Sequence, residues 1–251
     1  RLAFASEIPP LLGLPGVSRA ADPDAVADFL TRSVNNHHGH TMFADVRELP
    51  GAHYVEVALD EPIVFNPVRY WRPPTTLVHD LPFETAVEQF RALLEQSVQL
   101  HLRSDVPVGM LLSGGQDSSS LLALARHALG SGPELHTFSY RGQDGAVDEG
   151  RWIQAAQAAA HATGHDVRLT PEEWATDLHA LVASQGEPFA SPVIYAQRRL
   201  FQQAAANGVR VVLDGQGADE YLAGYDRFYP GRLATLLHQR RFQTFARVAL
   251  G

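Results

Sequence analysis

The chain has 251 residues, of which 45% are hydrophobic, so it is long and apolar enough to fold around a buried core. Its formal net charge of −8 disfavours a nucleic-acid binder, because such proteins normally present a basic face. The absence of cysteine excludes a disulfide framework, a thiolate metal site and a cysteine nucleophile within these residues.

Every basic side chain is an arginine, so a reaction that needs a lysine ammonium must receive it from outside this sequence. No apolar run approaches the ~20 residues of a membrane span, and the first residues lack the order of a signal peptide. These observations predict a soluble, cytoplasmic protein that works without a membrane or a nucleic acid. Because the chain starts at Arg1 without a methionine and stops just after a helical pattern, we expect a piece of a longer protein.

Residues 1–75 carry short strand-like stretches separated by prolines, a composition typical of β-rich or irregular structure. The stretches with strand character are Leu2–Ser6, His53–Leu59 and Val68–Trp71. One helix is predicted at Asp24–Arg32, with Asp22 as its N-cap and Pro23 at its first position. The segment RPPTT that begins at Arg72 predicts a boundary between two domains, residues 1–75 and residues 76–251.

Apolar residues from Phe83 to Leu102 recur at helical spacing and predict a long amphipathic helix. Strands and helices then alternate. The predicted strands are Val106–Leu112, Leu135–Tyr140, Asp166–Leu169 and Val209–Leu213. The predicted helices are Ser118–Leu129, Glu149–Ala162, Glu172–Ser184 and Tyr195–Ala206. Repeated βα units of this length are typical of an α/β domain with a doubly wound parallel sheet.

A first glycine-rich turn, SGGQDSS at Ser113–Ser119, lies between a predicted strand and a predicted helix. Gly114 and Gly115 allow the backbone to approach a ligand closely, and the helix directs free N–H groups at the turn. Three hydroxyls can add donors: Ser113, Ser118 and Ser119. Since Asp117 would repel a bare phosphate, it suggests a bridging Mg²⁺. The turn predicts a pyrophosphate-binding loop, and a capped turn without a ligand is the competing interpretation.

A second glycine-rich turn, DGQGADE at Asp214–Glu220, follows the last predicted strand. In an open parallel sheet, ligands bind beyond the carboxyl ends of the strands, where the strand order reverses. We therefore expect both turns to line one crevice, with Asp117 and Asp219 as paired magnesium ligands. The competing interpretation is a capped turn with acidic side chains on the surface.

These motifs also carry a family resemblance. Leu111–Ser119 resembles the signature of the N-type ATP pyrophosphatase superfamily. Four further segments are similar to glutamine-hydrolysing asparagine synthetases and their amidotransferase relatives: Asp148-Glu149, Gly186–Ser191, Tyr195–Gln197 and Leu213–Tyr225. Leu2–Leu12 and Leu49–His53 resemble the last stretch of the N-terminal glutaminase domain of that family.

The resemblance implies a sheet of the adenine-nucleotide alpha-hydrolase-like type in residues 76–251, truncated at its C-terminus. Residues 1–75 would be the β-rich end of a glutamine amidotransferase domain of the Ntn type. The implied reaction uses ATP and Mg²⁺ to adenylate the side-chain carboxylate of aspartate and to release pyrophosphate. Ammonia from glutamine then attacks the acyl-adenylate, which gives asparagine. A homodimer is compatible with this picture.

The resemblance also implies roles for single residues. Catalytic roles fall to Asp117, Gln216, Asp219 and Glu220. The residues that would contact ATP or pyrophosphate are Leu111, Ser113, Gly114, Gly115, Asp117, Ser118, Ser119, Tyr140, Asp214 and Gly215.

The sequence differs from the pattern of asparagine synthetases in two ways, so the identity of the acceptor acid is left undecided. The N-terminal cysteine of the glutaminase is absent, and the later active-site segments of the family are expected beyond Gly251. Gln216 stands where asparagine synthetases often have a glutamate, and a neutral amide cannot act as a base. One alternative is a related adenylate-forming synthetase of the β-lactam synthetase or lasso-peptide cyclase type. A segment that binds nucleotide without turnover is the other.

Several histidines are not assigned to a site. His37, His38 and His40 fit no tetrahedral metal spacing and are predicted to lie in a solvated loop. His161 and His165 flank a glycine turn and are predicted to cap a helix end.

Overall fold

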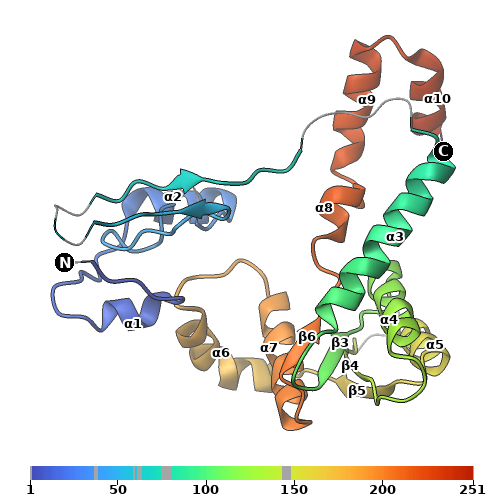
Figure 1. Ribbon diagram of the computed structural model, residues 1–251. Coiled ribbons are helices and arrows are strands. Elements are labelled where there is room, and N and C mark those ends of the chain that lie inside the picture. Colours follow the sequence, from blue (N-terminus) through green and yellow to red (C-terminus); the bar gives the residue numbers. More distant parts are fainter. Residues whose placement is uncertain are drawn as a thin grey trace. The chain divides into compact units, whose positions relative to one another are not determined.

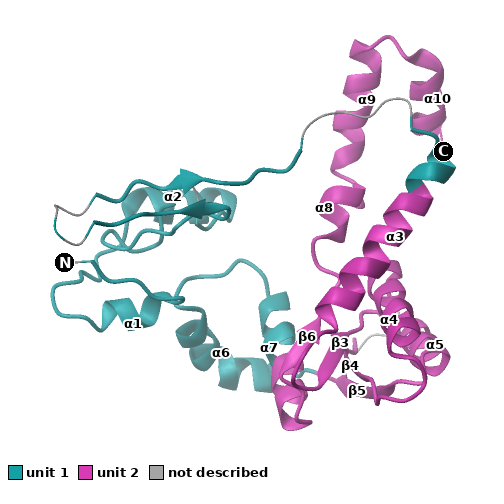
Figure 2. Cartoon of the chain, in the orientation of Figure 1, with its two compact units in different colours: residues 1–86, 169–198 teal, residues 87–168, 199–251 magenta. Residues whose placement is uncertain are grey.

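A computed structural model describes residues 2–36, 39–58, 60, 64–74, 81–142 and 148–250. The chain divides into two units (Figure 2): unit 1 is Arg1–Ala86 with Leu169–Arg198, and unit 2 is Val87–Arg168 with Arg199–Gly251. None of the helices in the described ranges combines the length and the apolar character that a membrane crossing requires. The predicted domain boundary at residues 75–76 lies outside the described residues and stays a prediction.

Unit 2 is built on a four-stranded parallel sheet with the order β5-β4-β3-β6 (Figure 1). The strands are β3 (Val108–Leu111), β4 (His136–Tyr140), β5 (Thr163–Val167) and β6 (Val211–Leu213). The chain passes from β3 through β4 to β5 in one direction, and β6 then pairs with the other side of β3. The strand order therefore reverses between β3 and β6. The predicted α/β class with a parallel sheet is confirmed.

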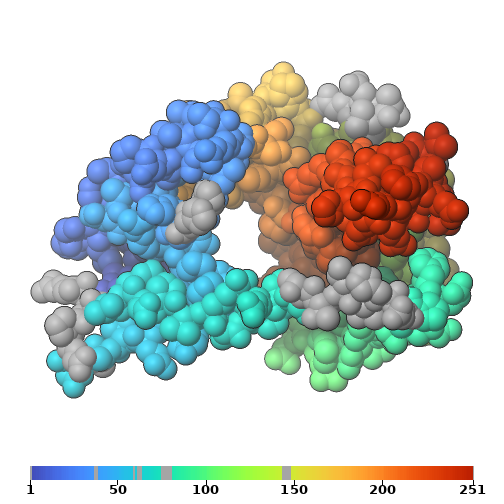
Figure 3. Space-filling model, turned by 90° about the horizontal axis from the view of Figure 1, so that it is seen from above, coloured from blue at the N-terminus to red at the C-terminus, as the bar shows by residue number. Residues whose placement is uncertain are grey.

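Helices alternate with these strands. Unit 2 contains α4 (Gln116–Leu129), α5 (Gly150–Ala159), α8 (Ala218–Leu222), α9 (Phe228–His238) and α10 (Phe242–Leu250). Two helices, α3 (Phe83–His101) and α7 (Val193–Ala206), have residues in both units. The last two helices pack on each other, and in the space-filling view they form one contiguous block, drawn in red (Figure 3).

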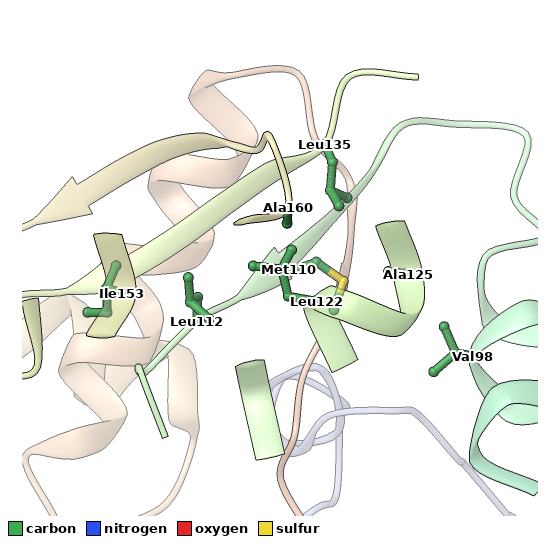
Figure 4. Close-up of a cluster of buried hydrophobic side chains, with 8 residues drawn as sticks. All are labelled: Val98, Met110, Leu112, Leu122, Ala125, Leu135, Ile153 and Ala160. Carbon is green, nitrogen blue, oxygen red and sulfur yellow. The ribbon is translucent and has the colours of Figure 1, made fainter. Parts of the chain in front are cut away.

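The core of unit 2 lies between the sheet and the helices α3, α4 and α5. Its buried side chains, shown in Figure 4, are Val98, Met110, Leu112, Leu122, Ala125, Leu135, Ile153 and Ala160. The run VGML of β3 is apolar without alternation because a central parallel strand packs on both faces. This core holds the carboxyl end of β3 and the start of α4 in place.

Unit 1 contains α1 (Ile8–Leu12), α2 (Pro23–Arg32), β1 (His53–Tyr54), β2 (Val68–Arg69) and α6 (Pro171–Gln185). The prediction for α2 is confirmed: the carboxylate of Asp22 accepts hydrogen bonds from the N–H groups of Asp24 and Ala25 at 3.0 and 3.1 Å. The two strands are two residues long each, so the described part of the first 75 residues is mostly irregular rather than rich in strands.

Some local predictions are wrong. Leu2–Ser6 forms no strand, and a short helix follows it because two prolines occupy its first turn, where no N–H is needed. The strand predicted at Asp166–Leu169 is Thr163–Val167, since its pairing with β4 begins at Thr163. His165 therefore lies in a strand and does not cap a helix.

The histidines predicted to lie in a solvated loop are only partly within the described residues. His40 lies 3.1 Å from the carboxylate of Asp22, whereas His37 and His38 lie outside the described residues. Across the described ranges, no group of three or more potential ligands could hold a metal ion.

Candidate functional site

The first glycine turn wraps the start of α4. Gly114 has a φ of +88°, and Gly115 occupies the N-cap position with an extended backbone. No side chain caps this helix. The first N–H groups of a helix lack partners within the helix, so the start of α4 offers donors and a positive dipole end to an anion.

Two serine hydroxyls hold the turn closed. The Oγ atoms of Ser113 and Ser118 lie 3.0 Å apart, and the N–H of Ser113 donates to Ser118 Oγ at 3.2 Å. The N–H of Gly115 donates to Ser113 Oγ at 3.2 Å, and Ser118 is buried. These hydroxyls brace the loop from within, and their contact with a ligand stays a prediction.

The second turn meets the first. Since β3 and β6 are neighbouring parallel strands, the loops that follow them leave the same edge of the sheet. Gly215 lies so close to α4 that a Cβ on it would be 3.4 Å from Asp117 Cβ and from the nitrogen of Ser118. The structure thus brings together the two segments that the sequence singles out.

A cavity of about 710 Å³ lies between α3, the start of α4 and α8, entirely within unit 2. Its polar lining comes from both turns: Asp117, Asp214, Gln216 and Asp219. Its opposite wall comes from α3: Phe90, Leu94, Ser97, Val98 and His101. Cavities of this size with a few convergent polar groups are typical of small-molecule sites.

The cavity is acidic, because three carboxylates line it: Asp117, Asp214 and Asp219. Within the described ranges none of the three forms an ion pair with a basic side chain. Carboxylate oxygens are the donors that Mg²⁺ prefers, and Mg²⁺ is usually held by one or two carboxylates together with phosphate oxygens. The donor set of this cavity therefore fits a magnesium–nucleotide complex.

Other predicted site residues lie outside the cavity wall. Leu111 is buried in β3, and Tyr140 is 43% exposed at the carboxyl end of β4. The carboxylate of Glu220 accepts a hydrogen bond from the hydroxyl of Tyr225 at 2.8 Å, an interaction that raises the pKa of Tyr225. The serines and glycines of the first turn, Ser113, Gly114, Gly115, Ser118 and Ser119, border the start of α4 without lining the cavity.

The α3 wall was not anticipated as part of a site. Phe90, Leu94 and Val98 belong to the helical stripe that predicted the amphipathic helix, so the apolar spacing was visible. That stripe is equally consistent with core packing, and only the tertiary structure shows that its exposed part faces Asp117 and Gln216 across a cavity.

Comparisons with known proteins point to one family. Residues 89–249 match the family model described as asparagine synthase. The chain is 30% identical over 244 residues to asparagine synthetase [glutamine-hydrolyzing] 2 of Bacillus subtilis, covering 89% of the chain and 32% of that protein. It is 31% identical over 204 residues to amidase chyE of Penicillium rubens, covering 75% of the chain and 30% of that protein. The chain thus spans about a third of the length of these curated relatives.

Among solved structures, the chain is similar to an NH3-dependent NAD synthetase from Campylobacter jejuni. The TM-score is 0.36 and the sequence identity 18%, with 58% of this chain and 61% of that chain covered.

Proposed function

The chain belongs to the asparagine synthase family, and we propose that it is the nucleotide-binding part of a synthetase that uses ATP to form an amide. The observation that carries the proposal is the meeting of two glycine turns at one acidic cavity, beside the uncapped start of α4. We further propose that its sheet is of the doubly wound, adenine-nucleotide alpha-hydrolase-like type. Residues 1–75 are then the end of a glutaminase domain.

The proposed reaction has two steps. A carboxylate oxygen of the acceptor acid attacks the α-phosphorus of ATP, and the bond to pyrophosphate breaks. The nitrogen of ammonia then attacks the acyl carbon, and AMP leaves. In the first step the turn at residues 113–119 holds the departing pyrophosphate on the N–H groups at the start of α4.

Asp117 and Asp219 are the residues that would hold Mg²⁺, which offsets the charge of the phosphates when it is bound. Asp214 and Gly215 would contact the nucleotide from the second turn. Gln216 lines the same cavity and would orient an oxygen of the acceptor acid through its amide.

Aspartate is the acceptor that the family suggests, with ammonia delivered from glutamine and β-aspartyl-AMP as the intermediate. One observation favours a second candidate. Gln216 faces the cavity as a neutral amide, so the site lacks a base at this position. The second candidate is a related amide synthetase with another acceptor acid.

Asp117→Ala tests the role of the first turn. We expect Mg-ATP to bind the variant roughly ten- to a hundredfold more weakly than the wild type, as is typical when a residue that supports a metal site is lost. Isothermal titration measures the affinity. Asp105→Ala, which removes an exposed carboxylate outside the cavity, is the matched control.

Equal affinity of Asp117→Ala and wild type would contradict the proposed site. Pyrophosphate release with ammonia and a panel of carboxylic acids then separates the candidates. Release that depends on aspartate supports asparagine synthesis, and release with another acid supports the second candidate. Binding without release from any acid supports a segment that binds nucleotide without turnover.

A further inference from the structure

Arg141 is a buried arginine directly after β4, in a part of unit 2 that the proposed reaction does not use. Only 8% of it is exposed, and its guanidinium is shared by two carboxylates. Its Nε and Nη2 donate to the two oxygens of Asp148 at 2.8 and 2.7 Å, and its Nη1 donates to Asp166 at 2.7 Å. Bidentate pairs of this kind are among the strongest and most directional polar contacts in proteins.

The guanidinium also covers the first residue of α5. A Cβ on Gly150 would overlap the guanidinium, so only glycine leaves room for it. The carboxylate of Asp148 accepts from the N–H of Gly150, and the Arg141 hydrogen bond holds its pKa below the ordinary value. The backbone N–H of Arg141 donates to Val167 at 2.9 Å. One side chain therefore joins β4, β5 and the start of α5.

The start of α5 is in turn the surface on which the first glycine turn rests. A Cβ on Gly114 would lie 3.1 Å from Ile153 and 3.2 Å from both the Cβ and the carbonyl oxygen of Glu149. Glu149 directly follows Asp148 and is the N-cap residue of α5. Any displacement of this helix start would therefore push on the backbone of the turn at Gly114.

We propose that Arg141 is a positioning residue for the turn at residues 113–119, acting through Asp148 and the start of α5. The inference rests on the proposed function, because it assumes that this turn binds pyrophosphate. Two carboxylates already neutralise the guanidinium, so Arg141 does not serve as a phosphate ligand itself. Its role is to hold the shape of the loop.

Arg126 provides a matched control. It is a partly buried arginine in the same unit, and its guanidinium likewise makes several hydrogen bonds, to the carbonyls of Gly130, Pro133, Ala160 and His161. It lies near the far end of α4, away from the first turn. Replacing it costs hydrogen bonds and stability without touching the contact at Gly114.

The experiment compares Arg141→Gln and Arg126→Gln by titration with Mg-pyrophosphate and by urea unfolding. We expect Arg141→Gln to bind Mg-pyrophosphate roughly ten- to a hundredfold more weakly than the wild type. We expect Arg126→Gln to lose stability while keeping the wild-type affinity. Wild-type affinity in Arg141→Gln, or an equal loss of affinity in both variants, would overturn the proposal.

A second variant with a smaller change tests the proposal in case Arg141→Gln does not fold. Gly150→Ala keeps Arg141 but displaces its guanidinium, and we expect a loss of affinity in the same direction. Unchanged affinity in a folded Gly150→Ala would overturn the proposal. If the wild type binds neither Mg-pyrophosphate nor Mg-ATP, the proposed function itself fails, and this inference falls with it.

Discussion

Three glycines of unit 2 show how single residues shape the candidate site. Gly114 rests on the start of α5, Gly150 makes room for the guanidinium of Arg141, and Gly215 touches the start of α4. At Gly114 the positive φ also favours glycine. The sequence alone singles out the glycines of the two turns. The sequence does not single out Gly150, because no local pattern shows that the side chain of Arg141, nine residues earlier, packs against it.

The surroundings of His165 predict how the stability of the fold depends on pH. Its Nε2 lies 3.0 Å from Nδ1 of His136, its ring stacks on Phe138, and Glu134 is the acidic group nearby. Burial lowers the pKa of His165 below its ordinary value of 6.5, and the charge of His136 lowers it further. The folded state therefore favours the neutral ring, while the unfolded state binds a proton more readily.

It follows that the stability contributed by the neutral His165 is complete above pH 6.5 and is lost as the pH falls through the lowered pKa of the folded state. We expect the urea midpoint of the wild type to fall more steeply than that of His165→Gln between about pH 7 and pH 5. His127→Gln, at an exposed histidine of α4, should keep the wild-type pH dependence. Identical slopes for His165→Gln and wild type would contradict the prediction.

At the scale of helices and strands, the predictions were best where a local signal marks a boundary. Asp22 and Pro23 identify the start of α2, and the apolar spacing identifies α3 almost to its ends. The strand β5 was misplaced because its sequence, TGHDV, shows no apolar alternation. Its hydrogen bonds to β4 stabilise the extended backbone there, and that pairing is invisible to a local pattern.

Gly109 in the middle of β3 allows a test of this packing. A Cβ there would lie 2.8 Å from Phe138 and 2.9 Å from Val209, both buried, so the sheet or its neighbours must shift. We expect Gly109→Ala to lower the free energy of unfolding by about 1–3 kcal/mol, the usual cost of overpacking. Urea unfolding measures the loss.

Gly132→Ala is the control for that experiment, because a Cβ at Gly132 meets nothing within 4 Å. Its stability should stay close to that of the wild type. If both variants were equally stable, the packing around Gly109 would be looser than the structure shows.

At the scale of the molecule, all of the candidate site belongs to one unit. The cavity, both turns and the Arg141 cluster lie in residues 87–168 and 199–251. Unit 1 has buried side chains of its own, including Leu181, and an aromatic group in which Trp174 and Tyr195 have ring centroids 5.0 Å apart. We therefore expect ligand binding to depend on the packing of unit 2.

Leu181→Ala tests this division. The side chain is fully buried in α6, so its truncation should cost about 2–5 kcal/mol of stability in unit 1, measured by urea unfolding. The affinity for Mg-pyrophosphate should stay at the wild-type value. Leu122→Ala removes a fully buried side chain of α4, the helix that begins at the first glycine turn, and should weaken this affinity. Equal weakening in both variants would show that the site depends on unit 1.

The amino-acid sequence alone was sufficient for the α/β class and for the two glycine turns, because these depend on short-range propensities and on local chemistry. The ligand of the turns stays a prediction. The tertiary structure decided which segments meet. It placed β6 beside β3, turned part of the α3 stripe toward a cavity and closed Arg141 onto Asp148 and Asp166. Most of these contacts join residues far apart along the chain, and they arise only when strands pair and a common core is buried.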